Sequence, residues 1–491
     1  MKTLHSIIYK NKSLKSRNIE TQRYKSFYSL VILLAFSAAN ADVVESGKWS
    51  SSSTWSEGEV PSSSLESPYT SLTMGSSGIT LEVDSDQWVD RLNVGDYTDT
   101  TIVIDSGVTF SIGGCDSPKE LITSSSASNT INFTGDGTLA LGFSKLADPL
   151  IGKSTIVFDV NVEGKAHWGN YFNTDSNANI TINKNFEIYG QSNFSGSTVS
   201  VNGSTFSTGT VIAFGKFFLS DNTNATVKAI NGGNWDIQGN VTVTGRYDWA
   251  DSRMAIKLNG TNVIGANASL KSTTEDSTGC VLLSGSLTSC AAENAVSFSK
   301  QTYLISSSAD NPYVLTLNSS NAINTEGAAS QGASNFNIIN YYLTYQDKVQ
   351  TEHFEASHAK IVLGANNDFG SFTYFDGSSL TMETNGFSST IGSFIGYADG
   401  ATFTLNLSNH NDFTLKLMEL DNIATFYDDD GFLRAENVFV FEDSYGEYAY
   451  ICAADDGGYW INATSAVPEP AAFAACFGAL ALAFAALRRR R

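Results

Sequence analysis

Three carboxylates near a glycine form the strongest candidate cation site in this sequence. Asp428 and Asp430 precede Gly431, and Glu436 follows it. Carboxylate oxygens gathered around a tight turn are the ligands that Ca2+ prefers. The distance from the glycine to the glutamate is one residue shorter than in an EF-hand loop. Two interpretations therefore stay open: a weak Ca2+ site at Asp428, Asp430 and Glu436, or a solvated acidic turn.

The other reactive side chains do not form a recognisable catalytic motif. A serine hydrolase of the α/β type would need Gly-x-Ser-x-Gly between a strand and a helix, and the sequence lacks it. His353 and His358 are five positions apart, whereas a zincin helix needs four, so a surface loop competes there with a metal site. We therefore expect no catalytic residue, and we expect the protein not to be an enzyme.

The cysteines allow one short-range disulfide. Cys280 and Cys290 flank a segment that is typical of two strands around a Ser-Gly-Ser turn, and a bridge across such a hairpin is geometrically allowed. Buried free thiols are the alternative. The pairing of Cys115 and Cys452 is undetermined, and no CxxC pair indicates zinc.

The charge of the chain excludes one class of partner. The formal net charge is −21, from 50 acidic and 29 basic residues. Such a chain repels the phosphates of nucleic acids, so we expect no nucleic-acid partner. Charged residues make up only 16% of the chain, which is low for a globular protein, and 41 glycines help to fill the difference. This composition favours turn-rich extracellular β structure.

Apolar and polar residues alternate with a period of two through most of the chain, in short runs bounded by Gly, Asn, Asp or Ser. Outside the two ends, no amphipathic helical period competes with this pattern. The clearest predicted strands are Thr101–Ile104, Val108–Ile112, Asn179–Ile182, Asn240–Thr244 and Ala401–Leu407.

A weak internal repeat suggests how these strands are arranged. Residues 177–190 return in altered form at 224–239. We interpret this spacing as about two rungs of a β-solenoid with roughly 20 to 25 residues each. The segment around Trp49 and Trp55 resembles the opening of secreted bacterial β-helix domains, in which tryptophans close the first rung; ordinary core aromatics are the alternative. The predicted fold class is all-β, a parallel β-helix or β-solenoid ectodomain.

The N-terminus has the pattern of a signal peptide. Seven basic residues precede an apolar core of about ten residues, at 27–36, which is too short to span a membrane. The small residues Ala39 and Ala41 then fit signal-peptidase cleavage before Asp42. We therefore expect residues 1–41 to be removed during export.

The C-terminus combines three features in a fixed order. Val467, Pro468, Glu469 and Pro470 are followed by an uncharged apolar run at 471–487, about seventeen residues and just long enough to span a bilayer as a helix. The chain then ends with four arginines, which the positive-inside rule keeps cytoplasmic: Arg488, Arg489, Arg490 and Arg491.

This order resembles the PEP-CTERM sorting signal of Gram-negative bacteria. The resemblance covers 467–491 only, and similar tails occur on proteins described as ice-binding. It implies that exosortase reads the Pro-Glu-Pro motif and removes the helix after the membrane has held the precursor. It also implies a link to exopolysaccharide and biofilm. The expected location is an inner-membrane-anchored precursor, followed by the cell surface or the extracellular space.

The sequence thus divides into four parts. They are a signal peptide at 1–41, a β-solenoid at 42–340, a C-terminal β region or cap at 341–461, and a linker with the sorting signal at 462–491. The function we expect is that of a non-catalytic structural or adhesive protein associated with exopolysaccharide.

Two alternatives to this function remain. The first is a carbohydrate-binding or polysaccharide-cleaving surface protein that uses Trp168, Trp235 and Trp249 as sugar platforms. The second is an ice-binding protein, although threonine does not recur in a sustained Thr-x-Thr register.

Overall fold

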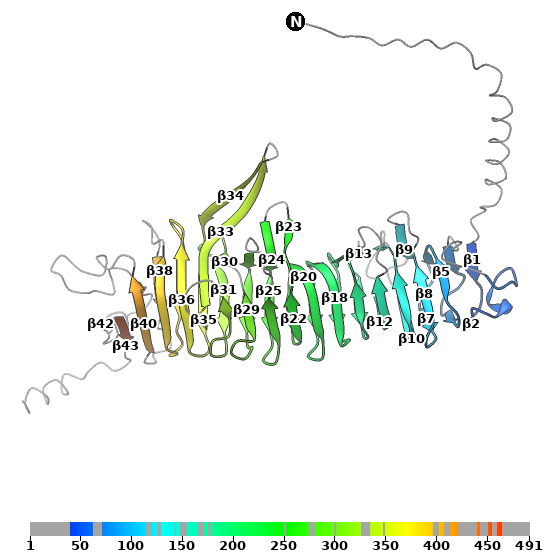
Figure 1. Cartoon of the computed structure of the whole chain (residues 1–491), viewed down its shortest axis with the longest axis horizontal. Coiled ribbons are helices and arrows are strands. Elements are labelled where there is room, and N and C mark those ends of the chain that lie inside the picture. Colours follow the sequence, from blue (N-terminus) through cyan, green and yellow to red (C-terminus); the bar gives the residue numbers. More distant parts are fainter. Residues whose placement is uncertain are drawn as a thin grey trace, which may run out of the picture.

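The chain winds into a long coil of parallel β-strands in the computed structural model (Figure 1). The structure describes residues 40–463 with gaps, the longest at 62–70, 326–333, 421–438 and 442–449. Within these described ranges the one helical element is the 3-10 turn η1 (Ser52–Thr54). The predicted all-β class is therefore confirmed, and the long parallel ladders agree with a β-solenoid.

Most strands pair with the strands one coil earlier and one coil later, which produces three faces. Face one consists of β2 (Gly47–Lys48), β4 (Thr80–Val83), β7 (Thr100–Ile104), the first halves of β10 (Thr130–Leu141) and β12 (Thr155–Gly164), β14 (Asn179–Ile182), β17 (Thr198–Val201), β19 (Phe217–Leu219), β21 (Trp235–Ile237), β25 (Thr261–Ile264), β28 (Ser286–Ser289), β31 (Tyr313–Leu317), β35 (His358–Leu363), β37 (Ser379–Glu383), β39 (Thr402–Asn406) and β41 (Phe439–Phe441).

Face two follows face one along the chain. It consists of β5 (Gln87–Val89), β8 (Thr109–Ile112), the second halves of β10 and β12, β15 (Phe186–Ile188), the first halves of β18 (Thr205–Ala213) and β20 (Asn224–Gly233), β22 (Asn240–Val243), β26 (Ser269–Ser272), β29 (Val296–Phe298) and β32 (Asn324–Thr325).

Face three completes each coil. It consists of β1 (Asn40–Val43), β3 (Ser71–Met74), β6 (Leu92–Gly95), β9 (Lys119–Ser124), β11 (Ser144–Ala147), β13 (Tyr171–Thr174), β16 (Gln191–Asn193), the second halves of β18 and β20, β24 (Ser252–Asn259), β27 (Cys280–Ser284), β30 (Thr302–Ile305) and the start of β33 (Ser334–Gln346). The ladder then continues through β36 (Asn367–Tyr374), β38 (Ser389–Ile395) and β40 (Phe413–Leu420).

The register shows that the internal repeat was interpreted wrongly. Ile180 of β14 pairs with Val199, and the same column then passes through Phe217 and Trp235 on face one. Ala225, which the repeat matched to this region, lies on face two instead. The coils differ in length because their corners hold different numbers of residues, so a fixed offset does not connect equivalent positions.

Large aromatic side chains fill the interior of the coil. Phe133 and Phe158, which pair on adjacent coils, stack with ring centroids 5.6 Å apart. The same packing recurs between Phe217 and Trp235, at 4.2 Å. The side chains of a strand point alternately inward and outward, so every second residue enters the interior. Because the coils pair in register, each inward residue lies against the inward residue of the next coil.

Polar side chains form ladders on the outside of the coil. The Asn202 amide donates to the Asn183 side-chain oxygen at 3.0 Å, and two positions further along the Ser204 hydroxyl donates to the Asn185 side-chain oxygen at 2.9 Å. The outward column of face one mixes chemistries rather than repeating threonine: Thr101, Asn132, Val157, Thr181, Ser200, Phe218 and Asp236 follow one another. This column therefore offers no flat threonine array.

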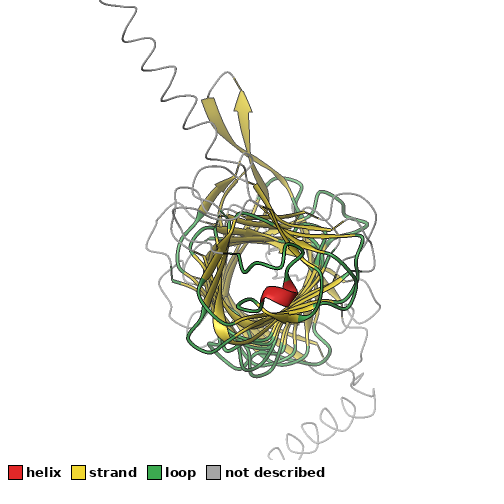
Figure 2. Ribbon diagram, turned by 90° about the vertical axis from the view of Figure 1, so that its right-hand side faces the viewer, coloured by secondary structure: helices red, strands yellow, loops and turns green. Residues whose placement is uncertain are grey.

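The first coil carries a cap at its open end. Trp49 and Trp55 are 1% and 4% exposed, and their rings meet edge to face at 4.8 Å. Viewed from the end that carries β1 and β2, the turn η1 lies within the outline of the coil (Figure 2). Both tryptophans are core residues, and they flank the turn η1 in the sequence.

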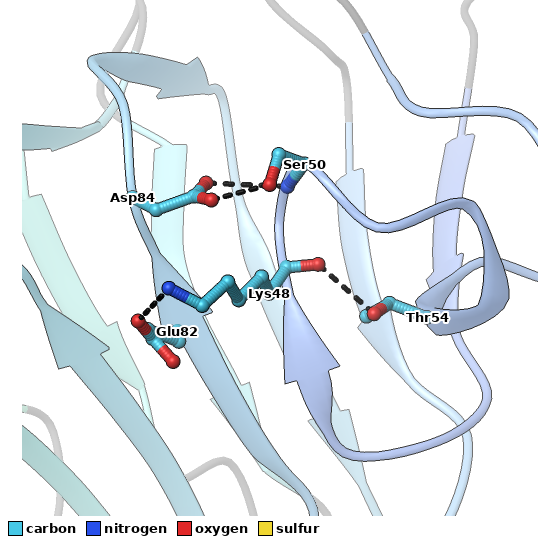
Figure 3. Close-up of polar contacts among 5 residues, drawn as sticks. All are labelled: Lys48, Ser50, Thr54, Glu82 and Asp84. Carbon is cyan, nitrogen blue, oxygen red and sulfur yellow. Dashed lines mark hydrogen bonds and ion pairs between the residues drawn. The ribbon is translucent and has the colours of Figure 1, made fainter.

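Polar contacts attach this cap to the coil behind it. Lys48 forms an ion pair with Glu82 at 2.7 Å, and the Ser50 amide and hydroxyl both donate to the Asp84 carboxylate (Figure 3). Thr54 donates its hydroxyl to the Lys48 carbonyl oxygen at 2.9 Å, which holds η1 against β2.

The parallel ladder does not stop at the boundary expected near residue 340. Strand β31 pairs with β35, and the column continues to β41. What changes there is that β33 extends beyond the coil and pairs antiparallel with β34 (Val349–Ala356). Antiparallel pairing also ends the ladder, where β43 (Tyr459–Ala463) joins β40 and β42 (Tyr450–Ala453).

Candidate functional site

The hairpin of β33 and β34 is the most prominent departure from the regular coil. It projects well away from the rod in two perpendicular views (Figures 1 and 2). The first part of β33 still pairs in parallel with β36, and from Ile339 onward the strand pairs antiparallel with β34. Alternation along both strands gives the hairpin an inner face and an outer face, with different chemistry.

The inner face of β33 is apolar and holds the hairpin to the coil. Ile339, Tyr341 and Leu343 pack against outward-facing side chains of face three, notably Leu282 and Tyr303. The Tyr303 and Tyr341 rings stack at 5.1 Å. This cluster is separate from the coil interior, so the hairpin has a small hydrophobic core of its own.

The outer face is a set of polar and aromatic side chains that contact one another. The Tyr342 and His353 rings lie parallel, with centroids 5.2 Å apart and planes 12° apart. The Tyr342 hydroxyl donates to Glu355 Oε1 at 2.6 Å, and Thr344 Oγ1 is 2.5 Å from His353 Nε2. Asn340 donates to the second oxygen of Glu355 at 3.5 Å. We call these five residues the outer patch.

Burial and charge act differently on the two faces. Burial raises the pKa of the Cys280 thiol to about 12 and that of the Tyr341 hydroxyl to about 12, with the charge of Glu352 adding to both. On the outer patch, the hydrogen bond to Glu355 raises the pKa of Tyr342. All three groups are therefore neutral at physiological pH, and the tyrosine hydroxyls remain hydrogen-bond donors.

A second hairpin lies beside the first on face three. Strand β23 (Tyr247–Trp249) pairs antiparallel with β24, and Arg253 of β24 donates to the Gln350 side chain of β34 at 3.2 Å. Trp249, a predicted sugar platform, ends β23; its side chain lies outside the described residues. The two hairpins are thus linked directly by Arg253.

The structure contradicts the predicted disulfide. Cys280 and Cys290 are both free thiols. Strands β27 and β28 are not a hairpin, because β27 pairs with β24 and β30 whereas β28 pairs with β25 and β31. Gly285, with φ +94°, turns the chain from face three to face one. Cys280 begins the strand before this turn and Cys290 follows the strand after it, so the length of both strands separates the two cysteines. Cys280 Sγ instead donates to the Arg253 carbonyl oxygen at 2.6 Å.

The sugar-platform prediction is wrong for Trp235. This side chain is 2% exposed and stacks on Phe217 inside the coil. A strand residue points inward or outward according to its register, and register was not known from the sequence. Trp168 lies outside the described residues.

The two histidines of the 352–358 segment belong to different elements. His353 lies on β34 in the outer patch, whereas His358 begins β35 and its Nδ1 is 2.7 Å from the Ser379 hydroxyl. The segment is therefore strand rather than the surface loop that was expected. In the part of the chain that the structure describes, no group of three or more His, Cys, Asp or Glu side chains could hold a metal ion.

The remaining predicted site residues lie mostly at the ends of the chain. The residues of the sorting motif (467–470), the terminal arginines (488–491), the Ca2+ candidates Asp428, Asp430 and Glu436, and Ala39 all fall outside the described residues. Ala41 is described and lies in β1, 4% exposed and paired with Leu72. Cleavage before Asp42 would therefore remove half of β1.

The comparisons with other proteins do not point to a function. The chain matches no protein-family model, no curated protein and no solved structure. Among the described residues, no helix is both long enough and apolar enough to cross a membrane.

Sequence reasoning missed the outer patch. Its signal was partial, because polar residues flank Tyr341 and Leu343 from Asn340 to Thr344, whereas the run from Thr351 to Glu355 is mostly polar. Only the first run has the alternation that is typical of a strand. The sequence predicts a boundary between two parts of the chain at this point instead of a hairpin.

Proposed function

We propose that this protein is an exported, non-catalytic structural or adhesive rod of the cell surface or extracellular matrix. Signal peptidase and exosortase would process its two ends, and exopolysaccharide would surround it. The observation that carries the proposal is the continuous parallel ladder from β2 to β41, joined in the sequence to a tail of Pro-Glu-Pro, apolar run and arginines.

The ladder supports a mechanical role. Stacked coils bury a continuous core and contact their neighbours along the whole length, which makes an elongated and rigid body. Ladders of Asn and Ser on the outside keep that body hydrated. A finer assignment of the fold as a parallel β-helix with a removable membrane helix is part of the same proposal.

The proposal can be tested by intact mass and cell fractionation. In the native host, we expect the wild-type protein to lose residues 471–491 and to be found outside the inner membrane. A variant with Pro468, Glu469 and Pro470 replaced by alanine should stay uncleaved in that membrane. A matched control with Thr464→Ala and Ser465→Ala changes the linker alone and should behave like the wild type. An uncleaved wild-type protein would refute the proposal.

One observation favours a carbohydrate-binding role in addition. The outer patch combines aromatic rings with hydroxyl, amide and carboxylate groups on a projecting element. Such a surface suits contact with a polysaccharide better than it suits coil packing.

A further inference from the structure

The outer patch makes no contribution to the packing of the coil that would explain its chemistry. The hairpin is anchored through its inner face, where Ile339, Tyr341 and Leu343 meet face three. The outer patch lies on the opposite side of the same two strands. Any stable hairpin could carry simple charged residues there, as most of β34 is exposed.

The patch is instead held in one arrangement by its own contacts. The ring of His353 packs flat against Tyr342, and its Nε2 is within hydrogen-bond distance of Thr344. Glu355 accepts from Tyr342 through one oxygen and from Asn340 through the other. Side chains fixed before binding lose little conformational entropy when a ligand arrives.

The chemistry of these groups selects a class of ligand. The apolar face of a sugar ring packs on an aromatic ring, and its hydroxyls bond to carboxylate, amide and hydroxyl groups at the edge of that ring. Tyrosine supplies such contact area at low entropic cost. The Tyr342–His353 pair, with Glu355, Asn340 and Thr344 beside it, provides both kinds of contact on one surface.

The charge of the protein narrows the class of ligand to neutral polysaccharides. Glu355 is exposed on β34 within the outer patch, and the whole chain carries a formal net charge of −21. A polyanionic polysaccharide would be repelled on approach and at the patch. A neutral chain would meet no such barrier.

We infer that the outer patch of the β33–β34 hairpin binds a neutral polysaccharide chain, with Tyr342 and His353 as the ring platform. This inference rests on the proposed function, since it names the matrix component that the rod would hold. Glu355 and Asn340 orient the sugar hydroxyls, and Thr344 fixes the His353 ring.

Binding is tested with the full chain purified in a mild detergent. Dextran and hydroxyethyl cellulose are the neutral probes and alginate is the anionic probe, each cast in native gels over a concentration series. We expect at least one neutral glucan to retard the wild type and alginate not to do so. Tyr342→Ala and His353→Ala should each weaken the retardation constant by about tenfold or more.

Matched controls separate a local effect from loss of the fold. Tyr189 is 80% exposed on the coil, and Tyr189→Ala should bind like the wild type. Tyr342→Phe keeps the ring but loses the bond to Glu355, so it should fall between the wild type and Tyr342→Ala. Circular dichroism should be the same for all four variants.

Several outcomes would overturn the inference. The first is that neither neutral glucan retards the wild type, or that alginate alone does. The second is that Tyr189→Ala loses as much retardation as Tyr342→Ala. The third is that Tyr342→Ala changes only the self-association of the protein in sedimentation velocity. The test needs no processing of the tail, and the fractionation test needs no hairpin. Failure of this inference and failure of the proposed function are therefore distinguishable.

Discussion

The coil and the β33–β34 hairpin bury their aromatic residues in opposite ways. In the coil, Phe158 is fully buried and contacts Phe133, Phe172 and Phe186 on three neighbouring strands. In the hairpin, Phe354 is 41% exposed. Among the described residues, Tyr341 is the one aromatic side chain whose ring it contacts. Aromatic side chains therefore fill the interior of the coil, whereas the hairpin buries Tyr341 against face three and leaves Phe354 partly in water.

Their strand pairing differs as well. A coil strand has a parallel partner on each side, so it contributes to two ladders and cannot move independently of its neighbours. The antiparallel part of the hairpin pairs within itself and rests on face three through one small cluster. Changes in the coil should therefore affect the stability of the rod, whereas changes in the hairpin should affect recognition.

The largest difference is expected from truncating one ring in each region. Phe158→Ala should lower the free energy of unfolding by about 3–5 kcal/mol, because it leaves a cavity in a stacked core. Phe354→Ala should lower it by less than about 1 kcal/mol, because the ring is already partly in water. Guanidinium titration followed by circular dichroism measures both. Equal losses would mean that the two regions do not differ as described.

A corner glycine should show the second largest effect. Gly285 has φ +94°, and a Cβ there would lie 2.3 Å from the Gly260 carbonyl oxygen of the preceding coil. Gly285→Ala should cost roughly 2–4 kcal/mol, from backbone strain and a backbone clash together. Gly58 is a matched control, because it has φ +69° with no atom near.

The Gly58→Ala variant should cost only about 1 kcal/mol, which is the strain alone. Both variants can be measured in the same guanidinium titration. A cost at Gly58 as large as that at Gly285 would show that close stacking of the corners is unimportant.

Thiol reactivity should separate the two regions without changing stability. Cys280 is buried beneath the hairpin, with its pKa raised to about 12, whereas Cys290 is partly exposed after β28. Iodoacetamide at pH 8, without reductant, should modify Cys290 at least roughly tenfold faster than Cys280, because the thiolate is the reactive form. Peptide mass spectrometry gives both rates. If neither thiol reacts until reductant is added, the free thiols described here are contradicted.

Alkaline titration should give the smallest effect. The folded-state pKa of Tyr341 lies at about 12, above the ordinary value of 10.0, because burial disfavours the charged form. Its contribution to stability is present below pH 10 and is lost as the pH rises through about 12. Absorbance at 295 nm, compared between the wild type and Tyr341→Phe, isolates this group. A difference spectrum with its midpoint near pH 10 would mean that the inner face is open to water.

The sequence predicted the coil better than it predicted the hairpin. The runs at 101–104, 179–182 and 240–244 are strands β7, β14 and β22, because alternation determines a half-buried strand locally. The lengths of the coils were not predictable in the same way, since corners tolerate insertions. That is why a fixed repeat offset assigned residues to the wrong face.

The candidate site depended on long-range register, which local patterns do not contain. Trp235 was predicted to be a sugar platform on the surface, yet its side chain points into the core. Tyr342 and His353 become neighbours only when β33 and β34 pair, and Cys280 becomes buried only when that hairpin folds onto face three. A one-residue shift in pairing would have reversed the two faces of the hairpin.

Hydrogen–deuterium exchange of the full chain, with and without the neutral glucan that retards it, tests the division between coil and hairpin most directly. We predict slower exchange in peptides covering 339–356 when the glucan is present, and no change in peptides covering β14 to β22. Protection spread along the coil, or no protection at the hairpin, would contradict the account.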